Sequence, residues 1–390
     1  GDGASPITST TFTATLFNTS IDDLGNMVND LKVSKSFGDA ATGKTTLTAG
    51  LFSSEQNVAL TWFWNQYTID MKNSGAKATL ATTGWNTWGG CCVRSFDVQY
   101  TNTAPYAAAT WELGNLTLDG SIRRDEQRAS GWAIQDDPVT QTWDPATQQN
   151  VNYTVSHTSY SLGGNYQLNK DLALFARVSD GVSFSADRLL YGNPLDGSVP
   201  VALNEVEQTE AGAKWRSGGF SLFATLFNAR TAENNYEATT QKFTANRYSA
   251  NGAELEMGYK MGDFRLAGGL TLTKAKITAS NDASTVGKKP RRQADVVYQL
   301  SPSYSFGPFE LGAAVIGTGK SFGDDANTIT MPGYTVVNAF ANWQVNDRAS
   351  VSLSVNNLGN TVGYTEIEGD GHAARSINGR TAKLGLKYTF

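Results

Sequence analysis

The last eight residues of the chain place an apolar side chain at every second position and end on an aromatic ring. They read Lys383-Leu384-Gly385-Leu386-Lys387-Tyr388-Thr389-Phe390. Successive side chains of a β-strand point to opposite faces, so the two leucines, the tyrosine and the phenylalanine share one face. A terminal strand with one apolar face is what a β-barrel in an outer membrane needs to close its wall against lipid.

The composition suits a wall of strands and turns better than a soluble enzyme. The 390 residues include 39 glycines, and 11% are aromatic but only 17% are charged. No apolar run approaches the roughly 18 residues that a membrane helix requires, so a membrane crossing needs strands. The mean hydropathy of −0.33 agrees, because the lumen and loops of a barrel are polar. A net charge of −5 argues against nucleic acid as a partner, since a surface that binds phosphates carries a basic excess.

Tight turns alternate with long polar loops along the chain, which is the layout of an outer-membrane barrel with periplasmic turns and extracellular loops. The turns lie at 37–44, 113–115, 169–171, 217–219, 261–263, 306–308 and 346–348. After them, the positions expected against lipid are Leu116, Leu118, Ile122, Leu172, Leu174, Val178, Phe220, Leu222, Leu226, Phe264, Leu266, Leu270, Leu272, Phe309, Leu311, Val315, Val351, Leu353 and Val355. The positions expected in a wet interior include Asp119, Arg177, Thr225, Arg265, Glu310 and Ser352.

Aromatic residues gather near the same turns and predict an interfacial girdle, where a ring meets both lipid and headgroups. They are Tyr166, Trp215, Tyr259, Tyr304, Phe306, Trp343 and Tyr388. Ordinary enrichment of strands in aromatic residues is the alternative for any single ring.

The alternation predicts an all-β fold, a transmembrane antiparallel barrel with about 15 or 16 strands in this chain. The strands are expected near 27–38, 44–60, 93–113, 115–128, 153–168, 171–184, 203–217, 219–235, 244–261, 263–279, 291–306, 308–322, 329–346, 348–364 and 374–390. An odd number cannot close as a usual bacterial barrel, and a sixteenth strand would have to come from residues 9–17. We therefore separate an N-terminal segment, 1–26, which is one strand or a loop, from a barrel over 27–390.

The N-terminus has no basic stretch followed by an apolar core, so no export signal is visible. The two cysteines, Cys91 and Cys92, are adjacent. A bond between neighbours is strained and metal ligands are usually spaced, so these form either a loop disulfide or two free thiols. With two histidines in the chain, a metal site is not expected.

The C-terminal third resembles a known family. Val355-Asn356-Asn357-Leu358-Gly359-Asn360, then Tyr364, then Gly379-Arg380 before the final strand are similar to the close of TonB-dependent outer-membrane receptors, although Gly359 stands where that family usually has Phe. The stretches 160–166 and 174–179 resemble its mid-barrel hairpins. The resemblance implies a 22-stranded barrel of which this chain supplies about the last 15 strands. It also implies a plug that contacts the periplasmic protein TonB. Because open strand edges are costly in hydrocarbon, we expect the plug and the early strands on a partner chain or segment, in a cleaved or split receptor.

The segment from Gly38 to Thr45 matches the phosphate-binding pattern G-x-x-x-x-G-K-[ST]. That chemistry needs a helix after the loop, whereas Thr45 to Phe52 alternates and is β-branched, so a hairpin is favoured over nucleotide binding. No nucleophile elbow or zinc-protease motif is present, and His157 and His372 have no evident nucleophile beside them. We expect neither an enzyme nor a cofactor.

Substrate contacts are expected on the long loops, where flat rings could stack on a sugar, an aryl group or an iron chelator. The candidates are Trp62, Trp64, Trp85, Trp88, Trp132, Trp143 and, more weakly, Tyr191. The alternative is that these rings pack loops together or touch lipid. The basic run Lys288-Lys289-Pro290-Arg291-Arg292 is either a contact for anionic lipopolysaccharide or a solvated loop flank.

Three functions compete. The first is energised uptake of a scarce nutrient, such as a metal chelate or a glycan, through a gated path. The second is a passive 16-stranded porin made by this chain alone, with residues 9–17 as the completing strand; steady single-channel conductance would distinguish it. The third is a surface adhesin or enzyme barrel, which would need a passenger domain or a catalytic dyad, and the sequence shows neither.

Overall fold

The structure is a computed structural model, and it describes residues 11–39, 41–70, 78–82, 93–137, 139–184, 203–237, 242–367 and 374–390. Antiparallel strands make up most of these ranges, and two short 3₁₀ turns lie at Pro145–Thr147 and Ala283–Thr285. Within the same ranges, no helix has the length and apolar character needed to span a membrane.

The strands differ widely in length. Their bounds are β1 Thr11–Asp23, β2 Asn26–Asp39, β3 Gly43–Asp70, β4 Ala78–Thr82, β5 Arg94–Leu113, β6 Leu116–Asp137, β7 Thr142–Trp143, β8 Gln149–Gln167, β9 Leu172–Phe184, β10 Leu203–Ser217, β11 Phe220–Glu237, β12 Lys242–Met261, β13 Phe264–Ser280, β14 Val296–Phe306, β15 Phe309–Thr318, β16 Ser321–Phe322, β17 Thr330–Met331, β18 Tyr334–Asn346, β19 Ala349–Asn356, β20 Tyr364–Ile367, β21 Ala374–Ser376 and β22 Thr381–Tyr388.

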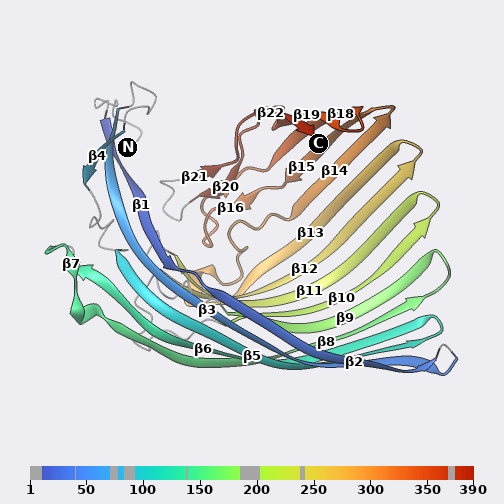
Figure 1. The fold of residues 1–390 in the computed structure, drawn as a ribbon, viewed down its shortest axis with the longest axis horizontal. Helices are drawn as coiled ribbons and strands as arrows, with labels where there is room; N and C mark the ends of the chain where they lie inside the picture. The colour runs from blue at the N-terminus through green and yellow to red at the C-terminus, as the bar shows by residue number, and fades with distance from the viewer. Residues whose placement is uncertain are drawn as a thin grey trace.

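Each long strand pairs antiparallel with the next long strand in the chain, from β3 through β5, β6 and β8 to β15, β18, β19 and β22. Figure 1 shows the result as one strongly curved sheet, with the tight turns along one margin and β4 and β7 at the other. We call the margin with the tight turns the turn end and the opposite margin the loop end. The all-β, antiparallel prediction is confirmed.

The N-terminal residues extend an existing strand. Both β1 and β2 pair with β3. In β1, Thr11 lies opposite Asp70 and Asp23 opposite Ala59, and in β2, Asn26 lies opposite Gln56. They occupy one position in the sheet, interrupted by an irregularity after Ile21. The expectation of a separate sixteenth strand at 9–17 is therefore wrong over its described part, because β3 is long enough to pair with both segments. In the described residues the main sheet is fifteen positions wide, with β1/β2 at one edge and β22 at the other.

The predicted tight turns are present and have identifiable causes. Gly218 and Gly262 adopt φ of 57° and 56°, the left-handed region that two-residue hairpin turns require. At two other turns an asparagine side chain closes the turn by a hydrogen bond to the backbone. The Asn169 Oδ1 accepts the Leu172 N–H at 3.0 Å, and the Asn346 Oδ1 accepts the Ala349 N–H at 3.0 Å.

The phosphate-binding pattern lies at the turn between β2 and β3. The Asp39 carboxylate accepts the Thr42 N–H at 2.8 Å and the Ala41 N–H at 2.9 Å, and the chain continues as β3. The hairpin interpretation of this motif is confirmed.

Several strands near the C-terminus are shorter than expected. The segment expected at 329–346 is divided into β17 and β18 around Pro332-Gly333, since proline lacks the N–H that a ladder needs. The segment at 348–364 ends at Asn356, because Asn357 and Asn360 both turn the backbone with φ of 50°. The segment at 374–390 is divided into β21 and β22, and β16 separates from the end of the segment expected at 308–322.

The two faces of the sheet differ as the alternation predicts. On the outward face the leucines are exposed: Leu226 is 68% exposed, Leu384 67% and Leu386 78%. At the turn end of this face the rings form a girdle of contacts, from Trp215 to Phe220 (5.4 Å between centroids), Phe306 to Phe309 (5.4 Å) and Phe309 to Trp343 (5.9 Å). Exposed leucines above a belt of touching aromatic rings are the surface that a bilayer solvates.

Candidate functional site

A cluster of aromatic rings lies at the loop end of β3. Trp62 and Trp64 are two residues apart and therefore share the inward face, where their rings stack with centroids 5.7 Å apart and an interplanar angle of 23°. They are 8% and 5% exposed, and the fully buried Val93 packs with them. β3 continues well beyond the roughly ten residues that cross a bilayer, so these rings lie outside the lipid layer.

Trp143 joins this cluster from another part of the chain. It lies on the two-residue strand β7, which pairs with the end of β6 through Asp136. Its ring packs at 5.7 Å from the ring of Phe63 and at 37° to it. The structure therefore brings together three of the tryptophans expected at the site, which we call the loop-end tryptophan cluster: Trp62, Trp64 and Trp143.

Charged groups border the loop-end tryptophan cluster. Arg94, 7% exposed, lies opposite Trp62 on β3 and opposite Gln135 on β6. The next residue of β6 is Asp136, at the loop end of the strand and outside the lipid layer. Burial raises the pKa of Asp136 to about 6, and the neighbouring Asp137 acts in the same direction while Arg94 opposes it. The loop end therefore combines flat rings and a buried guanidinium with a carboxyl group whose pKa is raised by burial.

The other predicted site residues do not join this cluster. Trp132 is half-buried on β6, but it alternates with Ala133, which packs on the inward face, so Trp132 points to the other face. Trp85, Trp88 and Tyr191 lie outside the described residues, as do Cys91 and Cys92.

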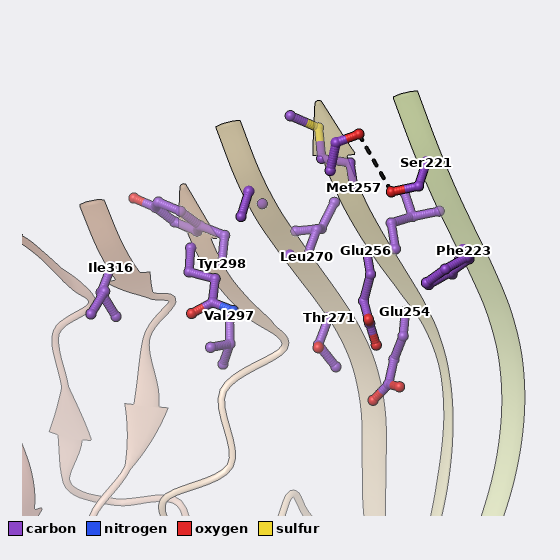
Figure 2. Close-up of a pocket in the computed structure, with 16 residues that line it drawn as sticks. Ser221, Phe223, Glu254, Glu256, Met257, Leu270, Thr271, Val297, Tyr298 and Ile316 are labelled. Carbon is purple, nitrogen blue, oxygen red and sulfur yellow. Dashed lines mark hydrogen bonds between the residues drawn. The ribbon is translucent and has the colours of Figure 1, made fainter. Parts of the chain in front are cut away.

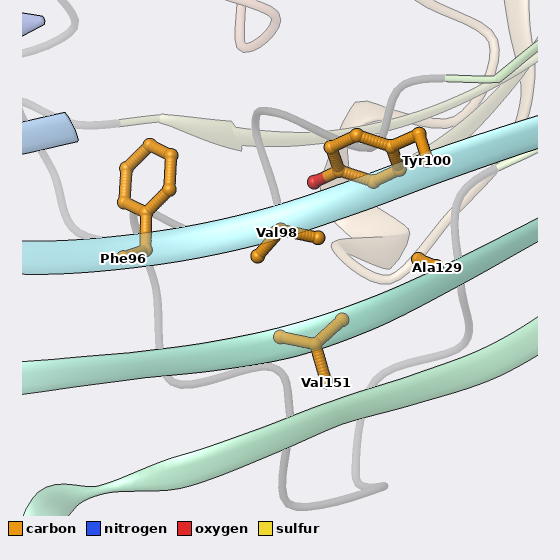
Figure 3. Close-up of a cluster of buried hydrophobic side chains, with 5 residues drawn as sticks. All are labelled: Phe96, Val98, Tyr100, Ala129 and Val151. Atoms are coloured by element: carbon orange, nitrogen blue, oxygen red, sulfur yellow. The ribbon is translucent and has the colours of Figure 1, made fainter. Parts of the chain in front are cut away.

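An apolar patch extends from this cluster along the inward face, and sequence reasoning missed it. Phe96, Val98 and Tyr100 of β5 pack with Ala129 and Val151, and all are at most 8% exposed. Figure 3 shows them on three neighbouring strands, β5, β6 and β8. The expectation of a wet interior is wrong here, because at this height the inward face is a buried apolar surface. The sequence could have predicted this patch, because apolar and polar residues alternate in Phe96-Asp97-Val98-Gln99-Tyr100.

Nearer the turn end the inward face becomes ionic. The Asp125 carboxylate accepts hydrogen bonds from Arg123 at 2.8 Å and from Asn102 at 3.0 Å. Arg177 of β9 donates two bonds, at 2.8 and 2.9 Å, to Asp119 of β6. These residues confirm the predicted polar interior at this height.

Two of the inward bonds pass over a glycine on the strand between the partners. Arg177 reaches Asp119 across Gly163 of β8, where an added Cβ would lie 2.5 Å from the Arg177 Nη2. Tyr106 of β5 donates to Asp30 of β2 at 2.9 Å and passes over Gly50 of β3, where a Cβ would lie 2.3 Å from the ring. The missing side chain is therefore what lets each bond join strands that are not neighbours. We call these glycine-spanning bonds.

A hollow of about 610 Å³ lies against β11 to β15. Figure 2 shows Glu254 and Glu256 of β12 beside Phe223 of β11 and Thr271 of β13. Glu256 is the register partner of Phe223, and Glu254 is that of Thr271, so both carboxylates face inward. Neither forms an ion pair with a described residue. The inward wall therefore offers negative charge at this position.

The basic run 288–292 is held by internal partners. The Lys288 Nζ donates to the Ala326 carbonyl at 2.9 Å, the Lys289 Nζ contacts Asp295 at 2.6 Å, and Arg292 pairs with Glu366. These bonds tie three loops together at the loop end. In the described part of the chain, no three His, Cys, Asp or Glu side chains are close enough together to hold a metal ion.

The arrangement suits reversible binding. The stacked indoles and the guanidinium beside them are at most 8% exposed, so only their edges are open to a planar or anionic ligand in this conformation. The ionic inward wall beneath can hold a polar occupant.

Comparison with known proteins identifies the family of the chain. Residues 4–358 match the family described as TonB dependent receptor-like, beta-barrel. A probable TonB-dependent siderophore receptor PiuA of Acinetobacter baumannii is 22% identical over 293 residues, covering 64% of this chain and 37% of that protein. The ferrioxamine receptor of Yersinia enterocolitica is 23% identical over 316 residues, covering 76% of this chain and 42% of that protein.

Solved structures agree on the fold. The siderophore receptor PiuA from Acinetobacter baumannii superposes with a TM-score of 0.71 at 18% identity, covering 96% of this chain and 56% of that one. The ferric preacinetobactin receptor BauA from the same species gives a TM-score of 0.70 at 15% identity, covering 98% and 57%. The chain thus spans about two-fifths of the curated relatives' length and forms part of a full receptor barrel. It belongs to the TonB-dependent receptors of the outer membrane and forms part of their β-barrel.

Proposed function

We propose that this barrel takes part in energised uptake of a metal chelate and that the loop-end tryptophan cluster contacts the chelate outside the cell. The observation that carries the proposal is the stacked pair Trp62 and Trp64, bordered by Arg94, on the inward face at the loop end. Planar chelators stack on indoles, and anionic chelates pair with guanidinium groups. The relatives named as siderophore and ferrioxamine receptors support a chelate over a glycan.

The proposal includes a plug inside the barrel. The ionic inward wall, with Glu254 and Glu256 uncompensated by described residues, can accept basic groups of such an occupant. The plug and the remaining strands would belong either to a further segment of the same polypeptide or to a partner chain. TonB would act on the barrel indirectly, by displacing the plug. Intact-mass analysis of the complex extracted from outer membranes distinguishes one polypeptide from two.

The test measures binding and transport separately. Outer-membrane protein carrying Trp62→Leu and Trp64→Leu, which keep an apolar side chain in each buried position, is compared with protein carrying Trp215→Leu, which removes an indole of the girdle at the turn end. We expect ferric chelates from a panel to bind the Trp215 variant with unchanged affinity and the double variant at least tenfold more weakly. Uptake of radioactive iron should need an energised membrane in wild type. Equal binding by both variants, or uptake that persists without energisation, would contradict the proposal.

A further inference from the structure

The outward face carries a group of cations just beyond its apolar rows. Three neighbouring strands, β11, β12 and β13, contribute them at the loop end: Arg230, Arg247, Lys274 and Lys276. We call this group the outward basic cluster. All four side chains are exposed. None of them was singled out by sequence reasoning, because three separate strands contribute them and only the register of the sheet brings them together.

The register fixes where these cations lie relative to lipid. Leu272 of β13 pairs with Ala253, which pairs with Leu226 of β11, so these side chains form one apolar outward row. Two residues further along β13, Lys274 pairs with Asn251, and two residues further again Lys276 pairs with Ser249. Side chains two residues apart on a strand share a face and lie about 7 Å apart. The cations therefore begin one row above the last leucines, at the height where hydrocarbon gives way to headgroups.

The positive charge of the cluster is in excess. Glu207 lies 3.9 Å from Arg230 and offsets that cation, and Glu205 lies nearby on the same hollow. Arg247, Lys274 and Lys276 make no ion pair with any described residue. An exposed cation at a membrane surface gains most from an anion in the adjacent leaflet.

A hollow in the outward face accompanies the cations. It measures about 380 Å³ and is bordered by Arg230, Arg247, Ser249, Lys276 and Thr278. Glu205 and Glu207 of β10 line its far side, so three cations face two carboxylates and the net charge of the hollow is positive. The Ser249 hydroxyl adds a hydrogen-bond donor between the charges, while the Thr278 hydroxyl donates to the Arg247 carbonyl at 3.1 Å and so holds the rim of the hollow. Cations and a hydroxyl donor around one depression are the groups that recognise a phosphate.

We propose that the outward basic cluster binds the phosphorylated headgroup of a lipid in the outer leaflet, with the acyl chains against the row of Leu226 and Leu272. The lipid class is a phosphorylated glycolipid of the lipid A type, because the cluster lies at the loop end, which is the outer side of the membrane. This proposal depends on the membrane position of the barrel and is independent of the transported cargo. The basic run 288–292, whose cations have internal partners, is a weaker candidate for the same ligand.

The test compares two lysine pairs. Lys274→Gln with Lys276→Gln removes two outward cations, and Lys383→Gln with Lys387→Gln removes two exposed lysines from β22, on the opposite face of the sheet from Leu384 and Leu386. Protein extracted from outer membranes is titrated with bisphosphorylated lipid A in detergent, and bound lipid is counted by native mass spectrometry. Each cation lost should weaken binding roughly fivefold. We therefore expect about a 25-fold loss for the outward pair and no loss for the β22 pair.

Further measurements distinguish binding of a phosphorylated lipid from binding of free phosphate. Dephosphorylated lipid A should bind the wild type and both variants equally weakly, and Lys274→Arg with Lys276→Arg should keep the wild-type affinity. Unchanged heat-dependent gel mobility shows that each variant is folded. Equal affinity of the outward variant and wild type for lipid A overturns the proposal. Displacement of lipid A by inorganic phosphate at equal concentration also overturns it, because the site would then bind an anion without the lipid.

Discussion

Replacing Leu270 by arginine tests whether the outward face of β13 contacts lipid. Phe264 begins β13 in the aromatic girdle, and Lys274 is the first outward cation above the apolar rows. About ten residues separate them, or roughly 34 Å of strand. A tilt of about 40° reduces this to roughly 26 Å, close to the apolar band of such barrels. Leu270 then lies near the middle of the bilayer.

The expected cost follows from this depth. An arginine on the lipid face at the midplane destabilises a barrel by about 2–4 kcal/mol. The neighbouring Thr271 faces inward opposite Glu254, where an added arginine could pair with the carboxylate. Thr271→Arg should therefore cost less than about 1 kcal/mol.

The assay is urea unfolding of the outer-membrane protein in phospholipid vesicles, with the free energy of unfolding obtained by linear extrapolation for wild type, Leu270→Arg and Thr271→Arg. Leu272→Arg, nearer the headgroups, should give an intermediate cost. If Thr271→Arg is as costly as Leu270→Arg, the assignment of outward and inward faces is wrong.

Three further predictions concern the loop end and the inward wall. Trp64→Ala should destabilise the loop end by about 3–5 kcal/mol, because it empties a buried ring site, and proteolysis within β3 should accelerate. The pKa of Asp136, about 6 against an ordinary 3.8, means that its stabilising effect is complete below pH 4 and is lost as the pH rises through 6. Asp136→Asn should remove this pH dependence, about 1–2 kcal/mol after solvent screening, in hydrogen exchange of the β6–β7 pair corrected for intrinsic rates. Gly163→Val should break the Arg177–Asp119 bond and cost about 1–3 kcal/mol by urea unfolding, whereas Gly181→Val, with open space around its Cβ position, should cost less.

Much of the fold could be predicted from the sequence because strand alternation is a local signal. The turns at Gly218, Gly262 and Asn346 were identified from residues that act within the turn itself. The boundary after Asn356 was missed because the alternation of β19 continues into residues whose backbone turns at Asn357. The length of β3 was underestimated because its pairing with β1 depends on residues far away in the sequence.

The candidate site was less predictable than the fold. Indole rings at loop ends were expected to contact ligand, and Trp62, Trp64 and Trp143 do meet in one cluster. Their meeting depends on the register of β3, β5, β6 and β7, which no local pattern specifies. Arg94 and Asp136 could not be identified from the sequence because they are distinguished by burial, which is a property of the assembled sheet. Trp132 does not join the cluster, because one residue of alternation decides its face.

The glycine-spanning bonds have a mechanical consequence. A backbone ladder holds only adjacent strands, but the Arg177–Asp119 and Tyr106–Asp30 bonds each clamp three strands at once. Sliding or spreading of the middle strand would strain both the ladder and the clamp. At these two places the spacing of three neighbouring strands is fixed, so the uptake proposed above would depend on rearrangement of the contents of the barrel and not on spreading of these strands.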